Sequence, residues 1–352
     1  PVRRRRDATI PHLPVSSVPP TNVPLVLAAS GEWFLHSGIQ DADGGVARYH
    51  LSSEGRNKPV SNEITGYAAS TYAVLYEQTG ERRYLDAAVK TARFLVEKAW
   101  RADIAQFPFE NSPDAPLYFF DCGIIVRGLL AVWRLTGEAR LLEVAVACGH
   151  GMARDFLAAD AIHPIVRMPA REPAPYVRRW SGEPGCLQLK SAMAWHELGD
   201  ITGDDRFTMW YERALGMALE NYAGFLPGAG TPEAVMDRLH AFGYFLAIEL
   251  EARYLREIRG VFERSDVNAQ LLRARLFAEA LGVLPLDEKA AAEEAAAVAG
   301  FQRENGCFCF GRKAGRMMPF DNPVSTAFCL QALVMWRERN DGKFAARVES
   351  II

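Results

Sequence analysis

The sequence has no uninterrupted apolar run long enough to cross a membrane, because Arg127, Arg134 and Glu143 break its longest apolar stretches. Its 40 Lys and Arg residues nearly balance 43 Asp and Glu, and the net charge of −3 excludes the strongly basic surface that nucleic-acid binding requires. Phosphate-binding glycine motifs are also absent. These absences predict a protein with no membrane span, no nucleic-acid partner and no nucleotide cofactor.

Cysteine is scarce as well. Six cysteines in 352 residues are too few for a disulfide scaffold, and several lie in apolar helical stretches where a free thiol packs as a small hydrophobic group. A composition of 49% hydrophobic and 24% charged residues is typical of a soluble globular protein. We therefore expect a globular protein of the reducing cytoplasm.

The first 21 residues differ from the rest of the chain. Four consecutive arginines, Arg3 to Arg6, precede a proline-rich stretch. A short run of charge on such a leader is typical of a solvated tail. We expect residues 1–21 to form a flexible Arg- and Pro-rich segment and residues 22–352 to form a single domain.

A turn sequence of Thr, Gly and an acidic residue occurs three times, each time between two helical stretches: Thr79–Glu81, Thr136–Glu138 and Thr202–Asp204. The glycine supplies the left-handed residue that ends the first helix, and the acidic residue favours the positive end of the next. The glycines are too far apart and too unevenly spaced for a tetratricopeptide array. The pattern predicts large helical hairpins.

Apolar periodicity predicts roughly eleven or twelve helices, among them 23–38, 64–76, 84–95, 124–135, 141–156, 187–198, 207–222, 234–254, 266–281, 287–302 and 323–337. Strands are expected only near 44–50 and 308–311. The first helix of each pair is apolar on all sides, whereas the second carries charge on one face. Buried inner helices that alternate with half-exposed outer ones predict an all-α toroid of about six hairpins.

On these hairpins, which span most of residues 22–340, the chain resembles the six-hairpin glycosidase superfamily. These are (α/α)6 barrels that include unsaturated glucuronyl hydrolases and N-acylglucosamine epimerases. The resemblance implies a single-domain toroid of inner and outer helices. It also implies a carbohydrate-active enzyme.

In such a ring the inner helices run parallel, so the residues that precede them line one mouth. Acidic residues occupy five of these positions: Glu63, Asp121, Glu183, Asp237 and Asp321. Each of them is also explained as an ordinary helix cap. Aromatic and basic neighbours, which capping does not require, favour a functional mouth.

The loops at that mouth carry residues suited to a sugar ligand. Aromatic rings can stack on sugar faces, and arginine forks bind carboxylates through two parallel hydrogen bonds. We expect a small, anionic carbohydrate substrate bound by Trp180, Arg179, Tyr118, Tyr49, His240 and Arg312.

Glycoside hydrolysis requires one protonated and one ionised carboxyl group, about 6.5–9.5 Å apart in an inverting enzyme. Asp121 is the predicted acid because it follows Tyr118, Phe119 and Phe120, an apolar setting that raises a carboxyl pKa. The resemblance points the same way, since glucuronyl hydrolases use aspartates near inner-helix starts. Glu183 or Glu63 is the predicted partner, followed by Asp321.

Two other functions fit the same mouth. A uronate lyase or epimerase would abstract a proton beside a carboxylate, using His240, Tyr49 or Tyr67 as base and acid while arginines neutralise the substrate. A glycan-binding toroid would hold the same ligand without turnover. His240 discriminates between them, because a histidine buried in the core would leave the lyase or epimerase without its base.

A zinc site is an alternative, because four cysteines are expected near this end of the ring: Cys122, Cys186, Cys307 and Cys309. Toroids that resemble lanthionine synthetase cyclases hold zinc through two cysteines and a histidine. Where that family places a cysteine after tryptophan, this chain has Ser181 after Trp180. We expect neither a metal nor another cofactor.

Overall fold

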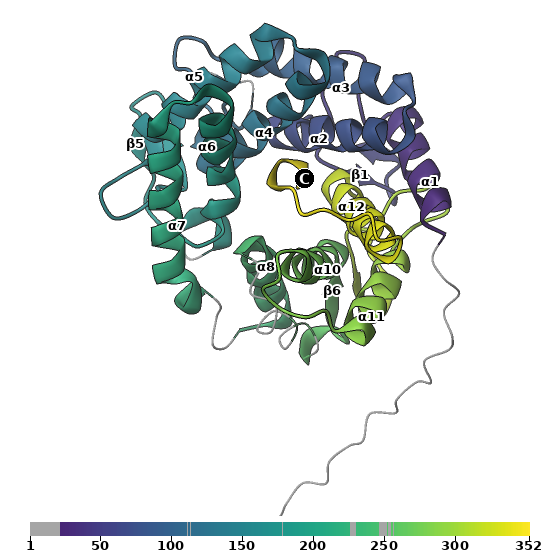
Figure 1. Cartoon of the computed structure of the whole chain (residues 1–352). Helices are drawn as coiled ribbons and strands as arrows, with labels where there is room; N and C mark the ends of the chain where they lie inside the picture. The colour runs from purple at the N-terminus through teal and green to yellow at the C-terminus, as the bar shows by residue number, and fades with distance from the viewer. Residues whose placement is uncertain are drawn as a thin grey trace, which may run out of the picture.

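The computed structural model describes residues 22–352 apart from 111, 113, 178, 226–229, 246–251, 253, 254 and 256. Eleven α-helices lie in this described part and form a closed ring (Figure 1). The all-α toroid predicted from the hairpin pattern is thereby confirmed. The predicted flexible segment 1–21 lies outside the described residues.

The ring has two concentric layers of helices (Figure 1). The inner layer consists of α2 (Asn62–Thr79), α4 (Phe119–Thr136), α6 (Gln188–Thr202), α8 (Pro232–Phe242), α10 (Ser265–Ala280) and α12 (Pro323–Asn340). The outer layer consists of α1 (Val23–His36), α3 (Arg82–Phe94), α5 (Ala139–Phe156), α7 (Asp205–Phe225) and α11 (Glu288–Ala299). Helix α12 packs against α2, which closes the ring between the two ends of the described chain.

The Thr-Gly-acidic turns end three of the inner helices as the sequence predicts. Gly80, Gly137 and Gly203 are left-handed, with φ of 71°, 69° and 68°. In each turn the threonine hydroxyl accepts a hydrogen bond of 3.2 Å from the backbone N–H of the acidic residue. The tripeptide therefore forms a complete turn in which glycine allows the reversal and threonine satisfies the next free donor.

Helix boundaries differ from the prediction where the inner helices begin. Helices α2 and α4 start earlier than expected, so Glu63 and Asp121 lie in their first turns. The fourth inner helix, α8, starts at Pro232, so Asp237 and His240 lie within it and do not precede it, which corrects the sequence prediction. Thr231 accepts a hydrogen bond from the Ala234 N–H, and this cap fixes the earlier start. The short 3-10 helix η3 (Gly243–Phe245) follows α8.

Three small antiparallel sheets join the loops around the inner-helix starts. Their strands are β1 (His50–Leu51), β2 (Arg56–Asn57) and β9 (Phe320–Asp321); β3 (Leu117–Tyr118), β4 (Ile165–Arg167) and β5 (Glu172–Pro173); and β6 (Phe262–Arg264), β7 (Gly311–Lys313) and β8 (Arg316–Met317). Strands β3, β6 and β9 each precede an inner helix directly, so these sheets fix the loops of the mouth.

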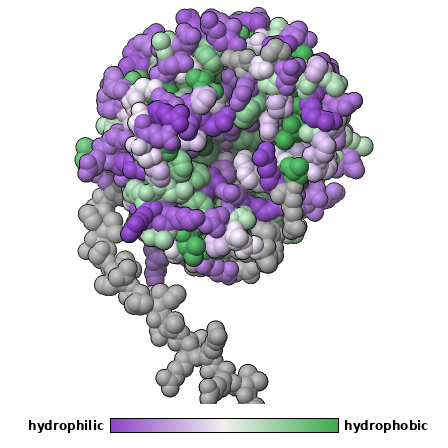
Figure 2. Space-filling view, turned by 180° about the vertical axis from the view of Figure 1, so that it is seen from behind, coloured by the Kyte–Doolittle hydropathy of each residue, from purple (hydrophilic) through white to green (hydrophobic). Residues whose placement is uncertain are grey.

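The described part of the chain contains no helix that is long and apolar enough to cross a membrane. Hydrophilic residues predominate on the face of the ring shown in Figure 2, as expected of a surface in contact with water. The apolar residues are concentrated between the two helical layers and inside the ring.

Helices α2 and α4 cross with their backbones in close contact, because glycines face each other at the crossing. A Cβ atom added at Gly128 would lie 2.4 Å from the carbonyl oxygen of Gly66, and one added at Gly66 would lie 2.9 Å from the Cα of Ile125. Real Cβ atoms do not approach backbone atoms so closely. The crossing therefore requires glycine, and it brings the first turns of α2 and α4 together.

We expect Gly128→Ala to lower the free energy of unfolding by about 1–3 kcal/mol, because the two helix backbones must separate to admit the methyl group. Urea denaturation followed by circular dichroism measures this change. Gly216→Ala on α7 is the matched control, since a Cβ atom there meets nothing within 4 Å. The control is expected to stabilise the protein slightly, because alanine favours a helix more than glycine does. Equal stability of the two variants would contradict the role of the crossing.

Candidate active site

Glu63 and Asp121 form a pair of interacting carboxyl groups at the starts of two adjacent inner helices. Asp121 is 6% exposed and Glu63 is half-buried. Burial raises the pKa of Glu63 from 4.5 to about 7, against the lowering effects of Arg48 and Lys190. Burial, and then the charge of Glu63, raises the pKa of Asp121 well above its ordinary value. Because two nearby carboxylates repel each other, the pair retains a proton near neutral pH.

Arg48, Tyr118 and Arg179 surround this carboxyl pair. Tyr118 caps the N-terminus of α4, and burial, followed by the charge of Asp121, raises the pKa of its phenol. Arg179 forms a hydrogen bond with Tyr118, and Arg48 acts on both carboxyl groups of the pair. Two guanidinium groups therefore lie near the carboxyl pair.

Trp180 lies beside these groups and contacts residues from two inner helices. Its ring meets Phe120 of α4 edge-on with centroids 6.3 Å apart. It meets His240 of α8 in the same manner at 5.8 Å. The indole is half-exposed, so one face is available to a ligand at the mouth.

His240 belongs to a buried hydrogen-bonded chain. Its Nδ1 lies 3.1 Å from the Asp266 carboxylate, and its Nε2 lies 3.0 Å from the Tyr244 hydroxyl. Burial, and then the charge of Arg264, lowers the pKa of the imidazole. A neutral ring with Nδ1–H donating to Asp266 and Nε2 accepting from Tyr244 satisfies both contacts. His240 is only 6% exposed, and both of its nitrogens are engaged within the protein.

Asp266 also binds Arg264 through two hydrogen bonds of 3.0 and 2.7 Å. Although burial opposes ionisation, the charge of Arg264 and the hydrogen bonds from Arg264 and His240 hold the pKa of Asp266 well below its ordinary value. Arg264 reaches Asp237 at 3.0 Å as well. Asp237, the acid predicted at the fourth inner helix, therefore pairs with Arg264 and is not part of the carboxyl pair.

Deeper in the ring lies Lys190 of α6, a residue that the sequence analysis missed. Its ammonium nitrogen lies 5.0, 4.4 and 4.2 Å from the ring centroids of Tyr67, Tyr244 and Phe328. Tyr67 is 2% exposed, and its hydroxyl lies beside that of Tyr244. Lys190 and Tyr67 both interact electrostatically with Glu63.

The remaining predicted site residues have other partners. Glu183 forms an ion pair with Arg238, and Asp321 forms one with Arg303 at 2.9 Å. Tyr49 packs edge-on against Phe320, with centroids 5.4 Å apart.

Arg312 donates a hydrogen bond to the Gly300 carbonyl and lies 4.3 Å from the Phe301 ring centroid. Of the four predicted catalytic acids, the structure thus places Glu63 and Asp121 together. In contrast, Glu183 and Asp321 each form an ion pair with an arginine.

The four cysteines expected near the mouth, Cys122, Cys186, Cys307 and Cys309, are buried free thiols. Within the described ranges, no group of three or more His, Cys, Asp or Glu side chains is arranged to hold a metal ion. Cys122 instead donates a hydrogen bond to Gln106 at 3.2 Å.

Solved structures of carbohydrate-active enzymes match about nine tenths of this chain. A sugar epimerase from a ruminal bacterium superposes with a TM-score of 0.64 at 13% identity, covering 89% of this chain and 97% of that one. The chain has the six-hairpin toroid fold. Cellobiose 2-epimerase from Spirochaeta thermophila superposes at 0.63 with 14% identity, covering 90% of this chain and 98% of that one.

An alpha-1,6-mannanase from Salegentibacter sp. also superposes on the toroid, with a TM-score of 0.57 at 13% identity, covering 89% of this chain and 99% of that one. No protein-family model and no curated protein matches the sequence. At these identities the similarity establishes the fold, and the reaction must be argued from the site.

Proposed function

We propose that this toroid is a glycoside hydrolase that acts on an anionic, uronate-type oligosaccharide. The observation that carries the proposal is the coupled carboxyl pair, Glu63 and Asp121, at the starts of adjacent inner helices. Glycoside hydrolysis uses such a pair with its members in different protonation states. The mannanase and the sugar epimerases named above share this fold, which supports a sugar as the substrate.

In this mechanism Asp121 is the general acid. Its carboxyl stays protonated near neutral pH, because burial and the charge of Glu63 raise its pKa. It donates its proton to the glycosidic oxygen as the bond to the anomeric carbon breaks. Glu63, on whose pKa the charges of Arg48 and Lys190 act against burial, is the general base and removes a proton from the attacking water.

Arg179 supplies recognition of the substrate carboxylate. It is exposed beside Tyr118, and none of the ion pairs among the described residues includes it. We expect Arg179→Met to raise KM for an acidic oligosaccharide roughly tenfold with little change in kcat, because a charged hydrogen bond in a partly solvated site contributes about 1.5 kcal/mol. Arg316→Met, another exposed arginine in β8, is the control. A rise in KM for neutral substrates as well would contradict the role in charge recognition.

The test of the function is incubation of the purified protein with uronate-containing and neutral oligosaccharides, including unsaturated uronates. New reducing ends, seen by mass spectrometry and by a reducing-sugar assay, are the expected result. Loss of absorbance by the unsaturated uronate indicates hydrolysis, whereas a gain indicates a lyase. Tight binding without any product would contradict an enzyme and favour a glycan-binding toroid.

A second candidate function is that of a sugar epimerase. It is favoured by the hydrogen bonds that link Asp266, His240 and Tyr244. A histidine oriented by a carboxylate is a suitable base for proton abstraction beside a carbonyl. It ranks second because both imidazole nitrogens are engaged and the residue is buried. Incubation in deuterium oxide separates the two, since an epimerase exchanges a carbon-bound hydrogen for deuterium and a hydrolase does not.

A further inference from the structure

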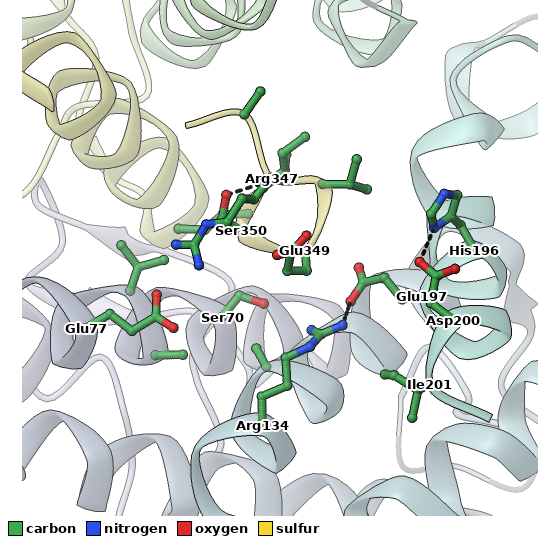
Figure 3. A pocket seen from close by; sticks show the side chains of 17 residues that line it. Ser70, Glu77, Arg134, His196, Glu197, Asp200, Ile201, Arg347, Glu349 and Ser350 are labelled. Carbon is green, nitrogen blue, oxygen red and sulfur yellow. Dashed lines mark hydrogen bonds and ion pairs between the residues drawn. The ribbon is translucent and has the colours of Figure 1, made fainter. Parts of the chain in front are cut away.

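The end of the ring opposite the carboxyl pair is closed by residues 346–352 (Figure 1). They form one wall of a cavity of about 630 Å³ whose other walls are the C-terminal halves of α2, α4 and α6 (Figure 3). Figure 3 shows Ser350 and Glu349 of this segment opposite Arg134 and Glu197. The segment therefore lies across the axis of the ring.

Three buried polar side chains, each from a different inner helix, hold this segment in place. Arg127 of α4 donates a hydrogen bond to the Val348 carbonyl at 3.0 Å. Lys190 of α6 and Arg273 of α10 donate to the Ile352 carbonyl at 3.0 and 3.3 Å. Because the axis is closed in this way, a glycan chain bound at the carboxyl pair must continue over the rim of the mouth, which is formed by the loops around the inner-helix starts.

That rim carries a strongly exposed aromatic ring, the phenol of Tyr176. Tyr176 is 50% exposed, more than any other Phe, Tyr or Trp in the part of the chain that the structure describes. Val177 beside it is also 50% exposed. An open aromatic ring next to a sugar-binding mouth is suited to stacking on the apolar face of a sugar.

His163 ties this ring to the start of α4. The Nδ1 atom of His163 lies 2.8 Å from the Tyr176 hydroxyl, and the two ring centroids are 6.1 Å apart. The next residue, Pro164, accepts a hydrogen bond of 3.1 Å from the Phe119 N–H. Phe119 begins α4, and Asp121 lies in the same first turn. Tyr176 is thus connected to the segment that carries the proposed general acid.

A tight turn connects Tyr176 to Trp180 on its other side. The Val177 N–H donates to the Gly182 carbonyl at 2.9 Å, and the Gly182 N–H donates to the Arg179 carbonyl at 2.9 Å. A Cβ atom added at Gly182 would lie 2.3 Å from the Val177 side chain. Because the turn is this compact, Tyr176 belongs to the same short loop as Arg179 and the half-exposed indole of Trp180.

The contact with His163 orients the Tyr176 ring without a ligand. A tyrosine side chain has two rotatable torsions, so a hydrogen bond at its far end leaves the ring little freedom. A ring that is already fixed loses little conformational entropy when it binds, which favours affinity. A tyrosine that only sealed the core would be buried, whereas half of Tyr176 faces water.

We propose that Tyr176, oriented by His163, is a distal sugar-binding platform that stacks on a sugar unit beyond the one that reacts at Glu63 and Asp121. The inference rests on the proposed function for the class of its ligand. It makes the preferred substrate an oligosaccharide longer than two units. His163 is a positioning residue, because it acts through Tyr176.

The test measures affinity by isothermal titration calorimetry for oligosaccharides of two, four and six units. The uronate series are oligogalacturonates and chondroitin fragments, and cello-oligosaccharides are the neutral series. In the series that binds, affinity is expected to rise about tenfold from two to four units, since one added ring contact has an effect of this size. Tyr176→Ala is expected to lose this gain and to keep its affinity for two units.

Two further substitutions separate stacking from general damage. His163→Ala is expected to lose part of the gain with length, and His163→Asn, whose amide can replace the Nδ1 contact, to restore it. Tyr222→Ala removes another exposed tyrosine, on the outer helix α7, and is the control that should bind every length as the parent does. An equal loss of affinity for all lengths in Tyr176→Ala would overturn the platform.

The outcomes also separate the platform from the proposed function. Binding that strengthens with length and depends on Tyr176, but yields no product, would support the platform and contradict a hydrolase. Hydrolysis with the same affinity for two, four and six units would support the hydrolase and overturn the platform. Absence of binding in every series would contradict both.

Discussion

Asp121→Asn is expected to lower kcat for glycoside hydrolysis by a factor of about 10²–10⁴, because an amide cannot donate the proton that the leaving oxygen requires. The side chain keeps its size, so the packing around the start of α4 is preserved. KM is expected to change little, since the substrate contacts remain. The measurement is steady-state kinetics on a substrate identified by product analysis.

The control for this substitution is Asp205→Asn, which makes the same chemical change in the first turn of the outer helix α7. Asp205 is exposed, and the control is expected to retain full activity. Substrates with a good leaving group, which need little protonation, should lose less activity in Asp121→Asn than natural glycosides do. Full activity of Asp121→Asn on a natural glycoside would remove Asp121 from the acid role.

Glu63→Gln is expected to flatten the dependence of protein stability on pH. The pKa of Glu63 is about 7 in the fold and 4.5 as its ordinary value, so between these pH values the folded state holds a proton that the unfolded chain releases. Stability therefore falls as the pH rises through this window. Glutamine removes the effect, and the stability of the variant relative to the parent should increase by roughly 2–3 kcal/mol between pH 4.5 and 8.

Urea denaturation at several pH values measures this difference. Glu212→Gln, an exposed position on α7, is the control and should follow the parent curve. The same Glu63→Gln variant should lose hydrolysis by at least about 10²-fold, because the base that activates water is gone. Parallel stability curves for Glu63→Gln and the parent would show that the pKa of Glu63 is not raised in the folded protein.

The sequence does contain a signal for the buried cations of the inner helices, which were not predicted as functional residues. Arg127, Lys190 and Arg273 are single charges in helical stretches that are otherwise nearly apolar, and a charge on a helix buried on all sides must face a polar interior. In the structure all three side chains donate hydrogen bonds to the backbone of residues 346–352. Their common target, the backbone of residues 346–352, has no sequence signature, because backbone carbonyl groups are the same in every residue.

Apolar periodicity predicts where helices lie but not which side chains of different helices interact, and the five acids at the inner-helix starts show this. Glu63 and Asp121 interact because α2 and α4 cross closely at Gly66 and Gly128.

The other three acids are each engaged by an arginine from elsewhere in the chain, Glu183 by Arg238, Asp237 by Arg264 and Asp321 by Arg303. Which acids pair with one another and which pair with arginines depends on the rotation of each helix about its axis and on loops that cross between hairpins.

The sequence by itself determined the hairpins, their turns and the ring, because apolar periodicity and left-handed glycines act over a few residues and recur along the chain. The lack of a long apolar run and of excess positive charge argues against a membrane span and against a nucleic-acid partner. Only the tertiary structure decided the site. Glu63 interacts with Asp121, and Lys190 donates a hydrogen bond to the backbone of Ile352. Both contacts join segments far apart in the chain, so their geometry depends on how the whole ring closes.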